Sequence, residues 1–187
     1  MSVPRLTDVW SPLNRMPDPS ATFARLRVPI GFVASAAALV LAHPTWTSIA
    51  WGLLLAAAGE ALRFWAAGHL EKGREVTSSG PYRFTGHPLY LGSTLLGAGF
   101  AVGSNSLVVG VIGALYLGLT LGAAIRNEEA GLRATFGRDY DEYRAGRGAG
   151  QARRFSLERA MRNREHRAVA GVAGVMILLA LKAWLLL

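Results

Sequence analysis

The most chemically versatile residues of this chain gather in a short polar connection between two apolar stretches. Residues 78–92 read SSGPYRFTGHPLYLG and combine a histidine, an arginine and two tyrosines with a Gly-Pro turn. Proline disfavours helix at the preceding residue and suits the first helical position, so His87-Pro88 predicts a histidine at a helix N-terminus. Free backbone N–H groups at such an end attract a carboxylate or another anion. The structural alternative is an interfacial aromatic belt of Tyr82 and Tyr90 with His87 as a cap.

Two adjacent carboxylates, Glu128 and Glu129, follow a later apolar stretch. Carboxylates that emerge from a membrane segment are costly unless they meet cations or water. They therefore either meet a cation in a functional site or form a solvated charge run beside Arg126 and Arg133. Both interpretations stay open at this point.

A charged pair, Glu60 and Arg63, stands one helical turn apart within an apolar stretch. Residues three apart share a helix face, so an internal ion pair is the simplest interpretation. Charged groups inside a membrane are also functional candidates by default. Arg63, His69 and Arg74 follow one another toward the polar connection and could line one path. We therefore keep Arg63 as a functional candidate and favour a structural role for Glu60.

The elements that must position these groups are membrane helices. Of 187 residues, 51% are hydrophobic, and they fall in blocks separated by arginine-rich stretches, as expected for one membrane-embedded domain. The chain has no cysteine, which excludes disulfides, thiolate nucleophiles and thiolate metal ligands, and no metal site is expected. The net charge of +8 comes mostly from arginines that flank the apolar blocks. Membrane lipid is therefore the expected partner, and nucleic acid is not.

Five apolar stretches predict an all-α integral membrane protein with about five transmembrane helices. They cover residues 28–42, 47–70, 89–102, 107–125 and 168–187, with 23–27 extending the short first span. The single domain accordingly divides into an N-terminal segment (1–27), a four-span core (28–125), an interfacial segment (126–167) and the last span. The interfacial segment is predicted to form an amphipathic helix with a break near Gly137, from the helical spacing of Leu132, Phe136, Tyr140 and Tyr143.

Arginine and lysine mark one side of this predicted membrane protein. They concentrate in 1–27, 71–88 and 126–167, whereas the turns near Pro44 and Asn105 contain none. The positive-inside rule places the N-terminus and the other basic segments in the cytoplasm, with Lys182 reaching toward the opposite surface. We expect the inner (cell) membrane of a bacterium, with the polar site facing the cytoplasm.

Two rows of small residues predict where helices approach each other closely. One row is Gly99 with Gly103, and the other is Ala114 with Gly118 and Gly122. Small side chains four residues apart allow helix backbones to come into contact. Both rows are therefore interpreted as packing surfaces.

The order of these motifs resembles the isoprenylcysteine carboxyl methyltransferase and phospholipid methyltransferase superfamily. An LRFWA stretch lies in one span and is followed by SGPYRFTGHPLYLG. A second pair of spans comes next, and then the glutamate pair, which is followed by Leu132, Phe136-Gly137, Tyr140 and Tyr143. The similarity covers roughly residues 55–145, about half of the chain. It implies a membrane methyltransferase that uses S-adenosylmethionine, bound in a pocket on the cytoplasmic side. The implied acceptor is lipophilic, either a prenylcysteine-like carboxylate or a lipid amine.

The resemblance also implies which residues bind the cofactor. They are Arg74, Glu75, Val76, Thr77, Tyr82, His87, Pro88, Leu89, Tyr90, Glu128 and Glu129. On the acceptor side, Arg63, His69 and Arg126 are the candidates. This chain departs from the superfamily just before the His-Pro pair, where Gly86 replaces the usual arginine and Arg83 is the candidate substitute.

Two other functions fit parts of the sequence. Sterol-type membrane reductases look similar in this helical core, and the arginines of 126–167 could bind the phosphates of NADPH. A membrane scaffold without activity would explain Gly86. Binding of S-adenosylmethionine or of NADPH separates the three possibilities, and the oligomeric state stays open.

Overall fold

The computed structural model describes residues 19–147 and 153–186, and all regular secondary structure within them is helical. The helices are α1 (Pro19–Leu41), α2 (Trp46–Ala67), the 3₁₀ helix η3 (Gly80–Arg83), α3 (Pro88–Ser104), α4 (Leu107–Phe136), α5 (Arg138–Arg144), α6 (Leu157–Arg162) and α7 (Glu165–Leu185). This arrangement confirms the all-α class for the described residues. Most of the predicted N-terminal segment, as far as residue 18, and Leu187 lie outside them.

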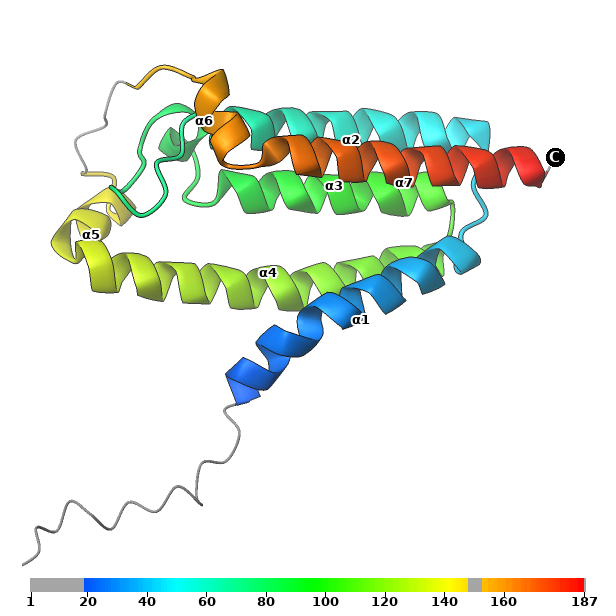
Figure 1. The fold of residues 1–187 in the computed structure, drawn as a ribbon, viewed down its shortest axis with the longest axis horizontal. Helices are drawn as coiled ribbons and strands as arrows, with labels where there is room; N and C mark the ends of the chain where they lie inside the picture. The colour runs from blue at the N-terminus through cyan, green and yellow to red at the C-terminus, as the bar shows by residue number, and fades with distance from the viewer. Residues whose placement is uncertain (1–18, 148–152, 187) are drawn as a thin grey trace, which may run out of the picture.

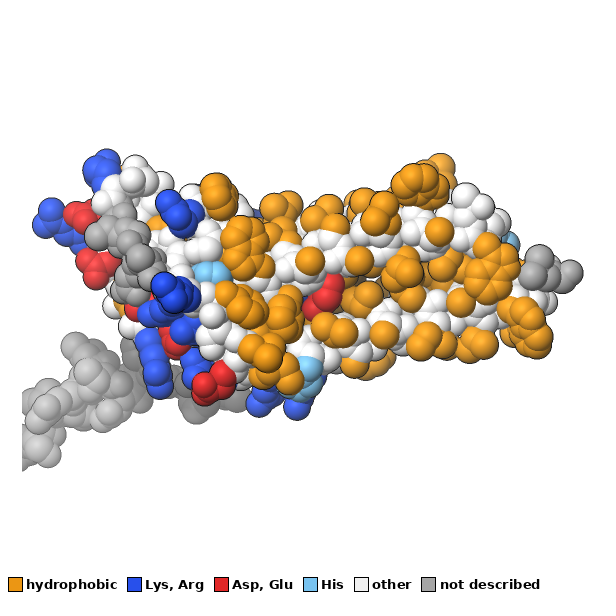
Figure 2. Space-filling view, turned by 90° about the horizontal axis from the view of Figure 1, so that it is seen from above, with side chains coloured by type: hydrophobic (Ala, Val, Ile, Leu, Met, Phe, Trp, Pro, Cys, Tyr) orange, Lys and Arg blue, Asp and Glu red, His pale blue; other side chains and the backbone are white. Residues whose placement is uncertain are grey.

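Three helices, α2, α4 and α7, are long and apolar enough to cross a membrane. The apolar part of α1, Pro29–Leu41, is shorter, and α3 has 17 residues. Figure 2 shows apolar side chains over most of the visible face, with the charged side chains gathered toward one end. A membrane protein is thus supported, whereas the number of five spans and their orientation stay predictions.

Helix α4 runs without interruption through residue 125, where the fourth span was predicted to end. The residues that follow include Glu128, Glu129 and Arg133, which are good helix formers and give the helix no reason to stop. The helix ends at Gly137, whose φ of 48° suits glycine, and α5 begins directly after it. The predicted break at Gly137 is therefore confirmed, and the carboxylate pair stands on a rigid extension of a candidate span.

Helices α2 and α3 pack with their backbones in contact. A Cβ atom added at Gly99 would lie 2.6 Å from the carbonyl oxygen of Gly52 and 2.7 Å from the backbone nitrogen of Ala56. Two turns nearer the polar end, Gly59 and Gly92 meet in the same way. The prediction that Gly99 belongs to a packing row is confirmed.

The second predicted packing row is wrong. A Cβ atom at Gly118 would have nothing within 4 Å, and one at Gly122 would meet only the Arg126 guanidinium. The row does not contact a neighbouring helix because α4 diverges from α3 there, and Ala114 and Gly118 line an apolar groove between the two helices. Spacing alone does not distinguish a helix interface from a cavity wall.

The two ends of the bundle differ in character. At one end the backbone N–H of His43 donates to the Ser104 carbonyl over 2.8 Å, which ties two turns together. There the Lys182 ammonium donates to the carbonyls of Leu39 and Val40 over 2.6 and 2.8 Å, at the C-terminus of α1. Figure 1 shows η3, α5 and α6 together at the other end. The polar segments between the helices therefore converge on one end of the bundle.

We predict that Gly99→Ala lowers the stability of the folded protein by about 1–3 kcal/mol, because the added methyl group meets backbone atoms that cannot turn aside. The melting temperature in detergent is the measurement. The matched control is Gly174→Ala in α7, where an added Cβ has nothing within 4 Å. Equal melting temperatures for the two variants would contradict the close α2–α3 contact.

Candidate active site

His87 is placed by the first turn of α3. It is the N-cap residue, Pro88 follows as the first helical residue, and the His87 side chain makes no capping hydrogen bond. Its ring turns toward α4, where Nε2 lies 3.1 Å from Oε1 of Glu129. An ionised carboxylate only accepts hydrogen bonds, so Nε2 is the protonated nitrogen and donates to Glu129. The histidine side chain is therefore part of a polar network and does not cap the helix.

Glu128 and Tyr90 complete the cluster around this histidine. Oε2 of Glu128 lies 3.9 Å from Nδ1 of His87, and the Tyr90 ring lies 5.7 Å from the His87 ring between centres. Glu128 is 44% exposed, whereas Glu129 is 21% exposed and His87 15%. The structure thus brings together four of the predicted cofactor residues, two from each of α3 and α4, and leaves one carboxylate accessible.

Arg144 also belongs to this cluster, and the motifs did not reveal it. Nη2 of Arg144 lies 3.4 Å from Oε1 of Glu129. Nη1 lies 3.1 Å from the position that a Cβ atom of Gly86 would occupy. The spacing of Tyr140 and Tyr143 predicts a helix after Gly137. It does not predict that this helix directs Arg144 toward Gly86 and Glu129.

The short helix α5 holds Arg144 in place through its two tyrosines. The Tyr143 hydroxyl donates to the carbonyl of Tyr82 over 2.8 Å, and burial raises the pKa of Tyr143, so this donor stays protonated. Tyr140 is only 2% exposed, and the Arg133 guanidinium lies 5.8 Å from the centre of its ring. Tyr82 is itself buried, and burial raises the pKa of its phenol. In the described structure Tyr82 therefore anchors α5 to η3.

An apolar groove of about 540 Å³ begins at His87 and Tyr90 and runs between α3 and α4. Small residues of both helices line it, among them Ala98, Ala101, Gly110, Ala114 and Gly118. Leu121 and Ile125 line its polar end, and Glu128 follows on the same face of α4 because residues three and seven apart align on a helix. The polar cluster thus stands at one end of this apolar groove.

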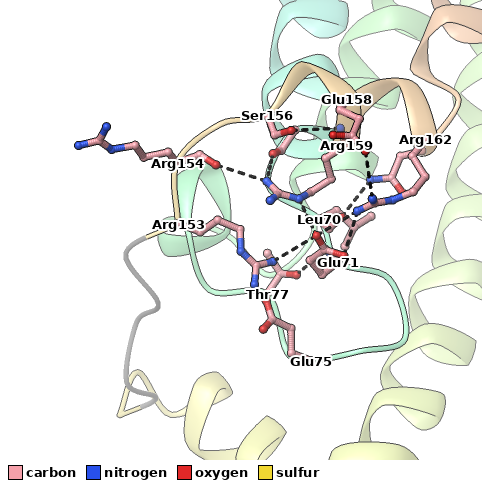
Figure 3. Close-up of polar contacts among 12 residues, drawn as sticks. Leu70, Glu71, Glu75, Thr77, Arg153, Arg154, Ser156, Glu158, Arg159 and Arg162 are labelled. Atoms are coloured by element: carbon pink, nitrogen blue, oxygen red, sulfur yellow. Dashed lines mark hydrogen bonds and ion pairs between the residues drawn. The ribbon is translucent and has the colours of Figure 1, made fainter.

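The predicted cofactor segment Arg74–Thr77 makes its contacts elsewhere. Glu75 accepts an ion pair from Arg153 at 2.6 Å, and the Thr77 hydroxyl accepts from the backbone N–H of Glu71 over 3.2 Å. Figure 3 shows Glu71, Glu75 and Thr77 directed toward the arginines at 153–162. The described contacts therefore tie this loop to α6 and to the residues before it, and do not join it to the His87 cluster.

The same loop is held by a carboxylate that binds several arginines at once. Oε1 of Glu71 lies 2.8 Å from Nε of Arg159 and 3.0 Å from Nη2 of Arg162. The hydrogen bond from Arg159, followed by the charges of Arg162 and Arg153, lowers the pKa of Glu71. We call Glu71, Arg159 and Arg162 the latch, since they fasten α6 to the loop after α2.

Arg63 is engaged by residues of two other helices. Its guanidinium donates to both oxygens of Glu165 over 2.9 and 3.0 Å and to the Ser93 hydroxyl over 2.6 Å. The predicted partner Glu60 is at the limit of an ion pair, with 4.0 Å between Nε and Oε2. Glu165 extends α7 three residues before the predicted start of the last span and fixes Arg63 between α2, α3 and α7.

His69 and Arg126 also lie apart from the His87 cluster. The buried His69 ring has Nδ1 3.0 Å from the Trp65 carbonyl, and Phe155 lies 6.1 Å away between ring centres. Arg126 is exposed and donates to the carbonyl of Gly122 over 3.2 Å. An acceptor role for Arg63, His69 or Arg126 stays a prediction.

The fold and the cluster together define a helical membrane-type protein with a charged site that opens onto an apolar groove. In a comparison with protein families, the chain matches the phospholipid methyltransferase model over residues 32–139. The match spans more than half of the chain, so the protein belongs to the phospholipid methyltransferase family, as the motifs indicated. Methyl transfer to lipid-type substrates is the activity that this family implies. No curated protein and no solved structure matches the chain.

We predict that Glu71→Gln weakens the latch in a pH-dependent manner. The lowered pKa means that the ionised carboxylate stabilises the folded state above its ordinary pKa of 4.5, and that this stabilisation is lost as pH falls through the lowered value. The melting temperature of the variant should therefore lie below that of the unmodified protein at pH 7, with a difference that shrinks below about pH 4.5. Glu158→Gln, at a side chain 89% exposed, is the control. A difference that is the same at pH 3 and pH 7 would exclude a charge-based latch.

Proposed function

We propose that this protein transfers a methyl group from S-adenosylmethionine to the amine headgroup of a lipophilic acceptor, at the cytoplasmic face of the membrane. The observation that supports this most directly is the network of His87, Glu129 and Arg144 at the mouth of the α3–α4 groove. A methyl donor and a lipid must meet there, one from water and one from the bilayer. Family membership supports the same reaction class.

The chemistry of the side chains fits the cofactor. S-adenosylmethionine has an ammonium, a carboxylate, ribose hydroxyls and a sulfonium. Glu128 and Glu129 can accept hydrogen bonds from the ammonium and the hydroxyls, and Glu128 is 44% exposed and so accessible. The ring of Tyr90 lies 5.7 Å from that of His87 between centres, and an aromatic face favours a cationic sulfur.

The charges around the groove favour an amine over a carboxylate as acceptor. None of the described residues that line the groove is an arginine or a lysine, and Glu128 stands at its mouth. Arg63, a candidate for binding an acceptor carboxylate, is neutralised by Glu165. Arg126, the other arginine among the acceptor-side candidates, donates to the Gly122 carbonyl of its own helix. The described groove lining therefore offers no arginine or lysine to an anionic headgroup, and Glu128 at its mouth attracts a cationic one, while Arg144 is paired with Glu129.

The reaction needs a proton acceptor as well as a bound donor. When bound, S-adenosylmethionine supplies a methyl group on a sulfonium: the nitrogen lone pair forms the N–C bond, and the S–C pair returns to sulfur as a neutral thioether. An ammonium headgroup must first release a proton. Nδ1 of His87 has its lone pair available when Nε2–H is donated to Glu129, so this nitrogen takes the proton. The resulting imidazolium lies between Glu129 and Glu128, which stabilise its charge.

The groove supports lateral entry of the acceptor from the bilayer. Its lining is almost wholly apolar, and it extends along α3 from Tyr90 to Ala101 and along α4 from Ile125 to Gly110. A lipid chain in this groove would place its headgroup beside His87. Positioning of two reactants in a water-poor site supplies much of the acceleration in a displacement of this type.

We predict that Glu128→Gln weakens binding of S-adenosylmethionine at least about tenfold, or about 1.4 kcal/mol, because the exposed acceptor for the donor's ammonium and hydroxyls is weakened. Calorimetric titration of the purified protein with S-adenosylmethionine, S-adenosylhomocysteine and NADPH is the measurement. The control is Glu142→Gln on α5, a carboxylate paired with Arg138. Unchanged affinity in Glu128→Gln would remove Glu128 from the site. Binding of NADPH alone would indicate a reductase, and binding of none of the three by folded protein would indicate a scaffold.

We predict that Gly118→Leu raises KM for a long-chain lipid amine by about tenfold, since roughly 1–3 kcal/mol of binding is at stake when the volume of an apolar pocket changes. A Cβ atom there meets nothing within 4 Å, so the side chain can extend into the groove without disturbing the fold. Affinity for S-adenosylhomocysteine should stay unchanged. Gly174→Leu on α7 is the control. A normal KM for Gly118→Leu would mean that the acceptor chain lies elsewhere.

A further inference from the structure

The carboxylate pair needs a cationic partner if it is to accept a ligand that is itself partly anionic. Among the described residues, Arg144 is the arginine or lysine that an ion pair joins to Glu129, and His87 is the other basic group in the cluster. With two carboxylates side by side, the ligand's own carboxylate would be repelled without such a cation. The geometry of Arg144 therefore decides where that carboxylate can bind.

The helix N-terminus predicted to bind an anion is already satisfied. The backbone N–H groups of Tyr90 and Leu91 both donate to the His87 carbonyl over 3.1 Å. Pro88 has no N–H to offer. Of the first four residues of α3, only Leu89 could present a backbone donor, so this helix end is a poor site for a carboxylate.

Arg83, the candidate substitute for the missing arginine, is exposed and lies at the end of η3. Arg144 is better placed, because its Nη1 lies 3.1 Å from where a Gly86 Cβ would be. A side chain at position 86 would occupy this place, so glycine there leaves room for a guanidinium that comes from α5. With 44% of its side chain exposed and several N–H donors, Arg144 can bind Glu129 and a ligand together.

We propose that Arg144 binds the carboxylate of the methyl donor's amino-acid part, and that Gly86 makes this possible by admitting its guanidinium beside His87. This assignment rests on the proposed use of S-adenosylmethionine. A guanidinium matches a carboxylate with two parallel hydrogen bonds, and Glu129 fixes its orientation from the other side. The donor's ammonium and carboxylate are thus recognised by opposite charges, the first on α4 and the second on α5.

The test compares S-adenosylhomocysteine with its decarboxylated analogue, which keeps the amine and the adenosyl thioether. Calorimetry should show that the unmodified protein prefers S-adenosylhomocysteine, and that Arg144→Gln lowers its affinity about tenfold, the range expected when a charge-assisted bond is lost. The affinity for the decarboxylated analogue should stay within about twofold, or rise, because the variant loses a positive charge. The preference between the two ligands should therefore disappear. Arg138→Gln, on the same helix and 90% exposed, is the control and should keep it.

Two further variants keep the proposal testable if Arg144→Gln disturbs α5. Arg144→Lys retains the charge and should retain part of the preference. Gly86→Leu displaces the guanidinium and should reduce the preference as Arg144→Gln does. The double variant should bind S-adenosylhomocysteine no more weakly than Arg144→Gln alone, because both substitutions act through the same guanidinium. A preference that survives in Arg144→Gln, or additive losses in the double variant, would overturn the assignment. If the unmodified protein binds neither ligand, the proposed function itself is wrong.

Discussion

Backbone contact between α2 and α3 is the constraint on which the site depends. Gly52 with Gly99, and Gly59 with Gly92, bring the two helices together without intervening side chains. The same closeness lets the Arg63 stem pass over Gly92, where an added Cβ would lie 2.5 Å from its Cγ. Arg63 then reaches Glu165 and fastens α7 to this pair. The start of α3, and with it the His87 ring, is fixed by three helices before any loop contributes.

Much of the fold could be predicted because its signals are local. Apolar blocks gave the positions of α1 to α4 and α7, Pro88 gave the start of α3, and Gly137 gave the break before α5. Whether a row of small residues packs against another helix depends on where that other helix lies, which the segment's own sequence does not record. The row at Gly118 has the spacing of a helix interface but borders a groove, and the end of α4 at residue 136 reflects helix formers that continue past the apolar stretch.

The candidate site could be predicted where a motif places residues on one helix turn, and not where two elements meet. His87 with Tyr90, and Glu128 with Glu129, are such local pairs, and the structure joins them. Arg144 was not predicted because its approach depends on the space that Gly86 leaves. In the sequence, Gly86 appears only as the absence of the usual arginine. The segment at Arg74–Thr77 was assigned by resemblance, whereas the ion pairs of Glu71 and Glu75 with later arginines are long-range contacts that no local pattern records.

The continuity of α4 fixes the spacing between the apolar groove and the carboxylates at its mouth. Groove-lining residues and Glu128 stand on one uninterrupted helix, so the depth of the groove and the direction of the carboxylates share a single register. A substitution in the lining alters the space for the chain and leaves that register intact. Insertion or removal of one residue between Ile125 and Glu128 would turn the carboxylates by about 100° relative to the groove. The volume of the groove can therefore change through side-chain substitutions alone, whereas a change in the length of α4 would misalign the groove and the carboxylates.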